Sequence, residues 1–111
     1  AIELKNVNDS LTFNTSQIAK HQIANLKHAV KCGGLGYVLV RFKKALTPTG
    51  QKRLGTTKWS IDKTWALSIQ WICKKKETSF PIELLMAECL EVPWVPVLNK
   101  YDLKVLWQKT K

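Results

Sequence analysis

The sequence predicts one α/β domain with a mixed central sheet flanked by helices. The first 43 residues alternate between an apolar strand, an amphipathic helix, a Gly-Gly pair and a second apolar strand. A further apolar run at 64–73 has the alternation of a strand. The 111 residues suffice for one domain but not comfortably for two, and the 45% hydrophobic content is that of a globular chain.

Residues 1–5 are predicted to form the first strand. Side chains alternate between the two faces of a strand, so Glu3 and Lys5 share one face while Ile2 and Leu4 share the other. We expect the apolar pair to anchor this strand in the core. An apolar strand that begins at Ala1 needs neighbours, so we also expect sequence preceding Ala1 to belong to the domain, which makes the chain N-terminally truncated.

A helix and a buried strand are predicted to follow the polar, turn-rich residues 6–15. Thr15 or Ser16 is expected to cap the helix, and the Gly33-Gly34 pair ends it. Its apolar positions recur at helical spacing: Ile18, Ala19, Ile23, Leu26, Ala29 and Val30. The apolar run 35–43 then predicts a buried central strand, which completes a βαβ-type unit.

The rest of the chain is predicted to contain shorter elements. They are an exposed basic loop or hairpin at 44–58, a strand at 64–73 that Lys74–Lys76 ends, a short helix capped by Ser79, an edge strand at 92–98 and a last helix capped by Asn99 or Asp102. The short helix is expected to bury Ile82, Leu85, Met86 and Cys89. We therefore divide the single domain into a core at 1–43, an insertion or basic loop and hairpin region at 44–90, and an edge strand and C-terminal helix at 91–111.

The charge balance predicts an anionic partner. Eighteen Lys and Arg residues face eight Asp and Glu, giving a formal charge of +10. Nucleic acid is the first candidate, and solubility or nonspecific adhesion is the alternative. A membrane is not expected, because the basic residues do not gather on one amphipathic helix and no apolar run approaches about 18 residues. Three scattered cysteines without zinc-ligand spacing suit a reducing cytosol.

Glu3 and Lys5 form the candidate catalytic pair. A carboxylate can ligate a hard metal ion, and a neighbouring ammonium can orient water or stabilise charge developing on a phosphate. The same tripeptide pattern also occurs by chance, and a solvated strand face is the alternative interpretation. Other chemistries lack support, because the sequence contains neither a glycine-rich phosphate loop in the right order nor a local Ser/His/Asp arrangement.

The order of several motifs resembles the RecU family of Holliday junction resolvases, within the PD-(D/E)xK nuclease superfamily. The resemblance covers about residues 2–43. It rests on Glu3-Leu-Lys5, Ser10-Leu-Thr-Phe13, a helix with His21-Gln22-Ile23, the Gly33-Gly34 stop and the strand ending in Val40-Arg41-Phe42. A weaker similarity lies at 97–107.

The resemblance implies a restriction-endonuclease-like fold and a structure-specific DNA endonuclease. It implies Mg²⁺-dependent hydrolysis, with Mn²⁺ as an alternative, of a four-way junction in recombination and repair. Glu3 and the backbone carbonyl of Leu4 would ligate the metal, Lys5 would assist the attacking water, and Gln22 would act near the metal or on DNA. Symmetric cutting of a junction implies a homodimer. The location implied is the cytoplasm of a bacterium, or of its host if a phage encodes the protein.

The residues expected to contact DNA fall into two groups. The resemblance assigns Ser10, Thr12, His21 and Arg41, although Arg41 is as readily explained by pairing with a nearby acid. The crowding of charge in one apparent loop adds Lys43, Lys44, Lys52, Arg53 and Lys58. The aromatic residues Trp59, Trp65, Trp71, Phe80 and Trp94 would either stack on unpaired bases or lie in the core.

One departure from the family bears on catalysis. The superfamily places an aspartate that ligates the metal on a strand upstream of Glu-x-Lys, and this sequence has no room for it before Glu3. Asp9 follows the strand and is a poor substitute. Either the aspartate lies in a segment absent from this chain, or the protein has lost it and only binds DNA. A repair nuclease of the same fold with another DNA substrate is a third interpretation.

Overall fold

A four-stranded mixed sheet forms the centre of the computed structural model, which describes residues 1–75, 77–95 and 100–101. The elements are, in order, β1 (Ile2–Val7), β2 (Thr12–Asn14), η1 (Thr15–Gln17), α1 (Lys20–Lys31), β3 (Tyr37–Ala45), α2 (Pro48–Leu54), β4 (Ser60–Ser68), α3 (Ile69–Lys74), β5 (Ser79–Pro81), α4 (Ile82–Glu88), β6 (Leu90–Glu91), β7 (Trp94–Val95) and β8 (Lys100–Tyr101). The predicted α/β class is confirmed at this level.

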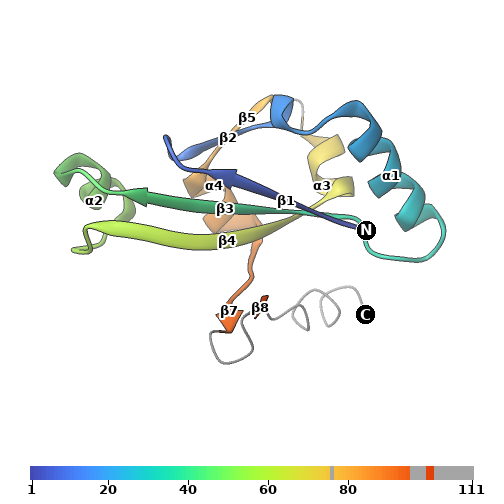
Figure 1. Ribbon diagram of the computed structural model, residues 1–111. Coiled ribbons are helices and arrows are strands. Elements are labelled where there is room, and N and C mark those ends of the chain that lie inside the picture. Colours follow the sequence, from blue (N-terminus) through green and yellow to red (C-terminus); the bar gives the residue numbers. More distant parts are fainter. Residues whose placement is uncertain (76, 96–99, 102–111) are drawn as a thin grey trace.

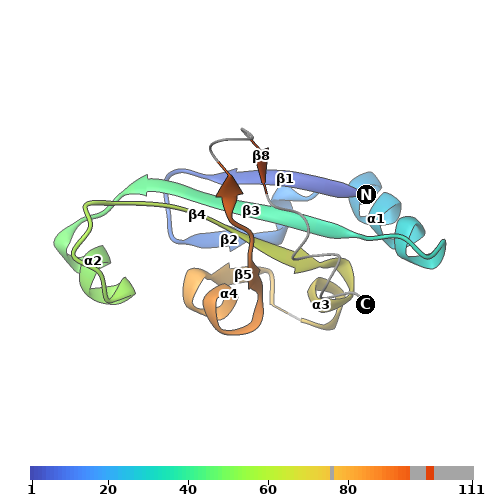
Figure 2. The ribbon, with the colours of Figure 1, turned by 90° about the horizontal axis from the view of Figure 1, so that it is seen from below.

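The strands of the sheet lie in the order β1-β3-β4-β6. β1 pairs with β3 in parallel, whereas β3 with β4 and β4 with β6 are antiparallel. β2 with β5 and β7 with β8 form two separate two-stranded sheets. Figure 1 shows α1, α3, β2 and β5 above the central sheet and β7 and β8 below it, and Figure 2 shows α2 at one end of the long strands. We call the face beneath α1 the inner face.

The main core lies on the inner face. Here β3 contributes Val38, Val40 and Phe42, which are buried as the predicted central strand requires. They pack against Phe13 of β2 and Phe80 of β5, which are paired across their two-stranded sheet and fully buried. A smaller cluster on the outer face includes Leu39, Ala66 and Val92. The sheet is therefore covered on both faces over its middle strands.

The predicted βαβ unit is present as β1-α1-β3. The start of the helix differs from the prediction, because Thr15 and Ser16 lie in the short 3₁₀ turn and α1 begins after Ala19. Its end agrees with the prediction: Gly33 follows the C-cap with a φ of 88°, in the left-handed region that glycine adopts without a Cβ clash.

The prediction that Ile2 and Leu4 anchor β1 in the core is wrong. Ile2 is 39% exposed and Leu4 is 50% exposed, while Val7 of the opposite face is buried. The cause is tertiary: β1 lies at the edge of the sheet, and α1 and β2 cover its Glu3–Lys5 face instead. The alternation correctly predicts which side chains share a face, but it does not predict which of the two faces the neighbouring layer covers.

Two further predictions of local structure are wrong. Residues 48–54 form α2 rather than part of a loop, with Thr47 as N-cap accepting from Gly50 N, and Pro48 in the first turn. The strand predicted over 64–73 ends at Ser68, whose hydroxyl caps α3 by accepting from Trp71 N at 3.1 Å. Both helices begin with a hydroxyl N-cap, a local signal that the surrounding lysines and glycines obscured for α2 and the apolar alternation obscured for α3.

The C-terminal third also departs in part from the predictions. Met86 is 50% exposed rather than buried with Ile82 and Leu85 in α4, and Ser79 lies in β5, so α4 begins after Pro81. The extended segment predicted at 92–98 is described only as far as Val95. Most of the helix predicted to start at Asn99 or Asp102 lies outside the described residues. None of the described helices is long and apolar enough to cross a bilayer.

Gly36 lies between α1 and β3, where the chain passes very close to α1 and to the start of α3. A Cβ at this position would lie 2.6 Å from the carbonyl oxygen of Leu26 and 2.8 Å from a methyl carbon of Val30. The Gly36 carbonyl also accepts a 2.9 Å hydrogen bond from Ile69 N. Glycine is therefore required here by space rather than by an unusual φ.

We predict opposite effects for two glycine substitutions. Gly36→Ala should lower the free energy of unfolding by about 1–3 kcal/mol, because backbone atoms must move to admit the methyl group. Gly50→Ala should raise it by roughly 0.5–1 kcal/mol, because Gly50 lies in α2 and its Cβ would have only ordinary contacts. Urea unfolding monitored by circular dichroism measures both, and equal stabilities of the two variants would contradict the packing described.

Candidate functional site

Glu3 and Lys5 lie side by side on the inner face of β1, as the alternation predicts. The parallel register pairs Glu3 with Val38 and Lys5 with Val40, two buried residues of β3. Both side chains are partly buried, and successive residues on one face of a strand are roughly 7 Å apart. A carboxylate and an ammonium are therefore held next to an apolar surface, where electrostatic interactions are stronger than in open water.

Gln22 connects this strand to the helix above it. Its Oε1 accepts a hydrogen bond from Ala19 N at 3.0 Å, which satisfies a free N–H at the start of α1. Its Nε2 then donates to Oε2 of Glu3 at 3.1 Å. Because the two ends of one amide have fixed partners, the side chain orients the Glu3 carboxylate while it caps the helix. The resemblance placed Gln22 near the site, but its capping role had gone unpredicted although Gln at the third helical position is a recognised signal.

The backbone of Leu4 faces the open edge of the sheet. The hydrogen bond from Tyr37 N to the carbonyl of Ala1 sets the phase of the parallel ladder. In a ladder of this phase the peptide groups of Glu3 and Lys5 point toward β3, and those of Leu4 point away from it. A Leu4 carbonyl at the edge is accessible as an oxygen donor beside the Glu3 carboxylate.

These donors fit Mg²⁺ better than a transition metal. Within residues 1–75, 77–95 and 100–101, no group of three His, Cys, Asp or Glu side chains is placed to hold a metal. Mg²⁺ prefers oxygen and is commonly held by one or two carboxylates, with water and substrate phosphate completing its shell. Glu3 and the Leu4 carbonyl are two such oxygens, so they suit a weak Mg²⁺ site that a phosphate must complete.

Three polar residues assigned to DNA lie around the start of α1 and β2. The Ser10 hydroxyl donates to the Thr12 carbonyl at 3.0 Å, so it stabilises its own turn. Thr12 begins β2 opposite Pro81, and its side chain is partly buried. His21 is exposed on the first turn of α1, next to Gln22. Of the three, His21 is the one whose side chain is open to a ligand near Glu3.

Arg41 lies on the outer face, away from Glu3. It makes a two-pronged pair with Asp62 of β4, with both nitrogen–oxygen distances at 2.8 Å. This geometry is the pairing with a nearby acid that the sequence allows as the alternative to phosphate binding. The guanidinium holds the pKa of the Asp62 carboxyl below its ordinary value, mainly through the hydrogen bonds. Arg41 therefore belongs to a different surface from the Glu3–Lys5 pair.

The remaining basic residues gather around α2, at one end of the long strands (Figure 2). Lys43, Lys52 and Lys58 are exposed, and Lys44 is partly buried on the inner face. Arg53 is tied to Glu83 of α4, with 2.7 Å between Nη2 and Oε1, and the Glu83 pKa is lowered by that hydrogen bond. This pair fixes α2 against α4, so the predicted basic loop is an anchored helix with lysines around it.

The five aromatic residues separate by exposure. Trp59 is 69% exposed, whereas Trp65 is 3% exposed and Phe80 is fully buried. Trp71 packs on Phe80 with 5.1 Å between ring centroids and lies beneath the Lys75 ammonium. The Trp94 side chain is outside the described part of the structure. The core interpretation thus holds for Trp65 and Phe80, and Trp59 is the exposed aromatic residue.

The three cysteines are free thiols that differ in exposure. The described residues contain no disulfide, and Cys32 and Cys73 are exposed while Cys89 is partly buried. Burial raises the pKa of Cys89 to about 12, so its thiol stays protonated at neutral pH. Thiolate chemistry is therefore disfavoured at Cys89.

No protein-family model matches this chain, and no curated protein matches it either.

We predict that Arg41→Gln will raise the pKa of Asp62 toward its ordinary value, because the hydrogen bonds to Arg41 are the largest cause of its depression. Lys43→Gln is the matched control: it also removes one positive charge, but Lys43 is the smallest contribution. Carbon-13 carboxyl titration by NMR measures both shifts. A larger shift in the Lys43 variant would contradict the pairing.

The sign of the pH effect on stability follows from the lowered pKa. The pair stabilises the folded state above the unfolded pKa of Asp62, and this stabilisation is lost as the pH falls through the folded pKa. Because the two side chains are 34% and 50% exposed, solvent screening limits the contribution to about 1 kcal/mol or less. Wild type and Arg41→Gln should therefore differ in stability at pH 7 and converge in acid.

Proposed function

We propose that Glu3 and Lys5 belong to the active site of a metal-dependent, structure-specific DNA endonuclease of restriction-endonuclease-like fold. Its preferred substrate is branched DNA, with the four-way junction first, and its cofactor is Mg²⁺ or Mn²⁺. The protein acts as a homodimer in recombination and repair, in the bacterial cytoplasm or that of a phage host. The resemblance over residues 2–43 supplies these specifics, and the arrangement around Glu3 supports them.

The observation that carries the proposal is the hydrogen bond of 3.1 Å from Gln22 Nε2 to Glu3 Oε2. These residues are 19 positions apart and belong to two separate motifs of the resemblance. A chance Glu-x-Lys on a solvated strand needs no helix residue to orient it. An amide fixed at both ends is the kind of support that metal-binding carboxylates receive in functional sites.

Each residue has a defined part in the proposed hydrolysis. Mg²⁺, when bound, supplies positive charge to the scissile phosphate and favours deprotonation of water. Glu3 and the Leu4 carbonyl would hold the metal ion at the edge of β1, where it could bind the phosphate. Lys5, on the same face, places its ammonium where charge develops on the phosphate. The hydrogen bond from Gln22 keeps the Glu3 carboxylate oriented for metal binding.

One observation favours a second candidate function, a DNA-binding module of the same fold without catalysis. Among the described residues, Glu3 belongs to no group of three His, Cys, Asp or Glu side chains that could hold a metal ion. The formal charge of +10 supports binding to DNA in either case. Cleavage therefore distinguishes the two candidates, whereas binding alone does not. A third candidate, a repair nuclease for another DNA substrate, predicts cleavage without preference for the junction.

We predict that the protein cuts a synthetic four-way junction in Mg²⁺ faster than a linear duplex of the same sequence. Glu3→Gln should lower the cleavage rate by about a hundredfold or more, the size of effect typical for the loss of one charged group in an active site. The measurement is product formation on denaturing gels, with junction binding in EDTA measured in parallel.

Glu77→Gln is the matched control, because it removes the same charge from an exposed residue between α3 and β5. It should cut at the wild-type rate. Equal cleavage of junction and duplex would remove the junction preference, and no cleavage by wild type would favour the binding module. Wild-type cleavage by Glu3→Gln would remove Glu3 from the site.

We also predict that the two functions of Gln22 can be separated. Gln22→Glu keeps an oxygen to accept from Ala19 N but can no longer donate to Glu3, so α1 should remain capped while cleavage falls roughly 10- to 100-fold. Gln22→Ala loses both interactions and should also destabilise the fold by about 1 kcal/mol. Thermal unfolding and cleavage rates are the measurements. Wild-type cleavage by Gln22→Glu would leave Gln22 as a cap only.

A further inference from the structure

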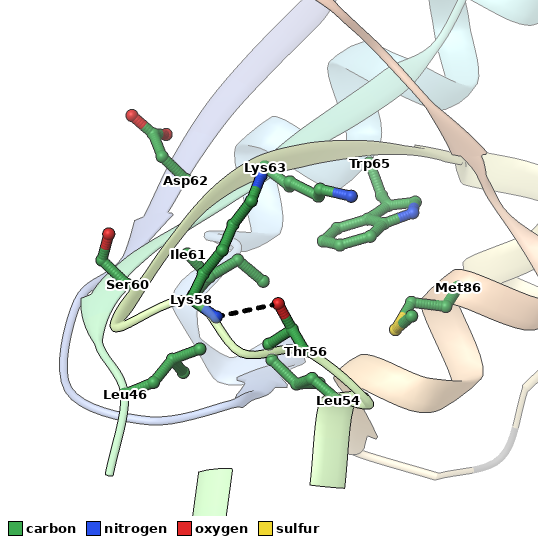
Figure 3. Close-up of a pocket in the computed structure, with 10 residues that line it drawn as sticks. All are labelled: Leu46, Leu54, Thr56, Lys58, Ser60, Ile61, Asp62, Lys63, Trp65 and Met86. Carbon is green, nitrogen blue, oxygen red and sulfur yellow. Dashed lines mark hydrogen bonds between the residues drawn. The ribbon is translucent and has the colours of Figure 1, made fainter. Parts of the chain in front are cut away.

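A pocket of about 340 Å³ lies at the end of the sheet that carries α2. Its volume is near the lower end of the roughly 300–1,000 Å³ typical of small-ligand sites. Figure 3 shows Ile61, Lys63 and Trp65 along β4, with Met86 of α4 across from them. Leu54 of α2 and Lys58 of the loop between α2 and β4 also line the pocket.

The walls of this pocket are apolar and only partly rigid. Trp65 is held by an edge-on contact with Phe42, with 5.9 Å between ring centroids, and is almost completely buried. Ile61 is likewise part of the core. Met86, in contrast, is half exposed, and its thioether is a polarisable group that contacts aromatic rings favourably. A flat apolar group is thus accommodated between a fixed wall and an adaptable one.

The charge at this pocket is positive. Lys58 has no ion-pair partner among the described residues, and Lys63 has one distant partner, Glu91, at 3.6 Å. The one carboxylate that borders the pocket is Asp62, which points away from it in Figure 3 and is paired with Arg41. Two ammonium groups beside an apolar pocket favour a ligand that joins a flat ring to an anion.

Trp59 provides a second flat surface, adjacent in the chain to two residues that line the pocket. It lies between Lys58 and Ser60, which both line the pocket, and its side chain is 69% exposed. An exposed indole in a basic environment is a surface on which nucleic-acid bases stack without regard to sequence. Trp59 directly follows Lys58 and lies four residues before Lys63 in the chain.

Hydrogen bonds hold the backbone at Lys58 and Trp59 in position. Its carbonyl accepts from Leu46 N at 2.8 Å, and the preceding carbonyl of Lys58 accepts from Gln51 Nε2 at 2.9 Å. Lys58 N donates to the Thr56 hydroxyl at 3.2 Å, the dashed line in Figure 3. Binding there would therefore cost little ordering of the loop, which favours affinity.

We propose that this pocket and Trp59 bind two successive unpaired nucleotides of a DNA strand. One base enters the pocket beside Met86, its neighbour stacks on Trp59, and Lys58 and Lys63 bind the phosphates. The inference rests on DNA as the partner in the proposed function, and it names the part of the substrate that this end of the molecule recognises.

The register of the sheet relates this site to the candidate active site. Lys5 pairs with Val40, and Val40 pairs with Trp65, so Lys5 and Trp65 lie in one row across the inner face. Two strand spacings separate them, roughly 10 Å between the strand axes. A DNA strand that leaves a duplex at a branch point can therefore be bound in the pocket while the duplex part of the same DNA lies near Glu3.

The test is binding of a short fluorescent oligo-dT to the full chain in EDTA, measured by anisotropy. EDTA separates this inference from cleavage, so its failure is distinguishable from failure of the nuclease proposal. Wild type should bind oligo-dT more tightly than an abasic strand with the same number of phosphates. Trp59→Ala should weaken oligo-dT binding about tenfold and reduce its preference over the abasic strand, because only the base in the pocket remains bound, and Trp59→Phe should restore most of the affinity.

The lysines are tested by the salt dependence of binding. For single strands each phosphate contact contributes about 0.7 to the slope of log K against log salt, so the Lys58→Ala/Lys63→Ala double variant should lower the slope by about 1.4. Lys20→Ala, at the exposed start of α1, is the control for general charge and should have little effect. An equal effect of Lys20 on a per-lysine basis would overturn the site.

The pocket itself is tested at Met86. Met86→Glu places a carboxylate at the mouth and should weaken binding about tenfold, whereas the similar-sized Met86→Gln should retain most of the affinity. Because Met86 is half exposed, both variants should fold. Equal affinity for abasic and intact strands, or wild-type binding by Trp59→Ala or Met86→Glu, would overturn the proposal. Displacement of the strand by an equal concentration of thymidine monophosphate would overturn it in favour of a free-nucleotide site.

Discussion

The parallel pairing of β1 with β3 is the constraint on which the rest of the structure depends. A parallel pair cannot close through a tight turn, so the chain must cross over the sheet, and α1 makes that crossing. The crossing places α1 over the Glu3–Lys5 face of β1. It also requires a close return of the chain beneath the helix, and Gly36 lies where a side chain would meet the backbone of α1.

This crossing also explains how two distant motifs form one site. The first turn of α1 has free N–H groups, and Gln22 satisfies one of them with its own side chain. The same amide then has its nitrogen available to Glu3 on the strand below. Helix capping and carboxylate positioning are thus performed by one group. The exposed lysines around α2 and the exposed indole of Trp59 lie at one end of the long strands of the same sheet.

Part of the fold and of the site could be predicted from local pattern. The β1-α1-β3 unit, the buried β3 and the shared face of Glu3 and Lys5 follow from periodicity and from the Gly33 stop. The helix at 48–54 had its own signals, Thr47 and Pro48, but the surrounding lysines and glycines suggested a loop. The segment after Ser68 has apolar residues at spacings that suit either a strand or a helix, and the hydroxyl cap of α3 decided it.

The sequence by itself determined which side chains share one face of a strand or helix, because the two-residue period of a strand and the 3.6-residue period of a helix are properties of the backbone. Only the tertiary structure decided which face is covered. Ile2 and Leu4 are exposed because β1 is an edge strand with its covering layer on the other side. Likewise Trp65 is buried and Trp59 is not, although both have lysines nearby in the chain. Burial depends on contacts between segments distant in sequence, and no local pattern records them.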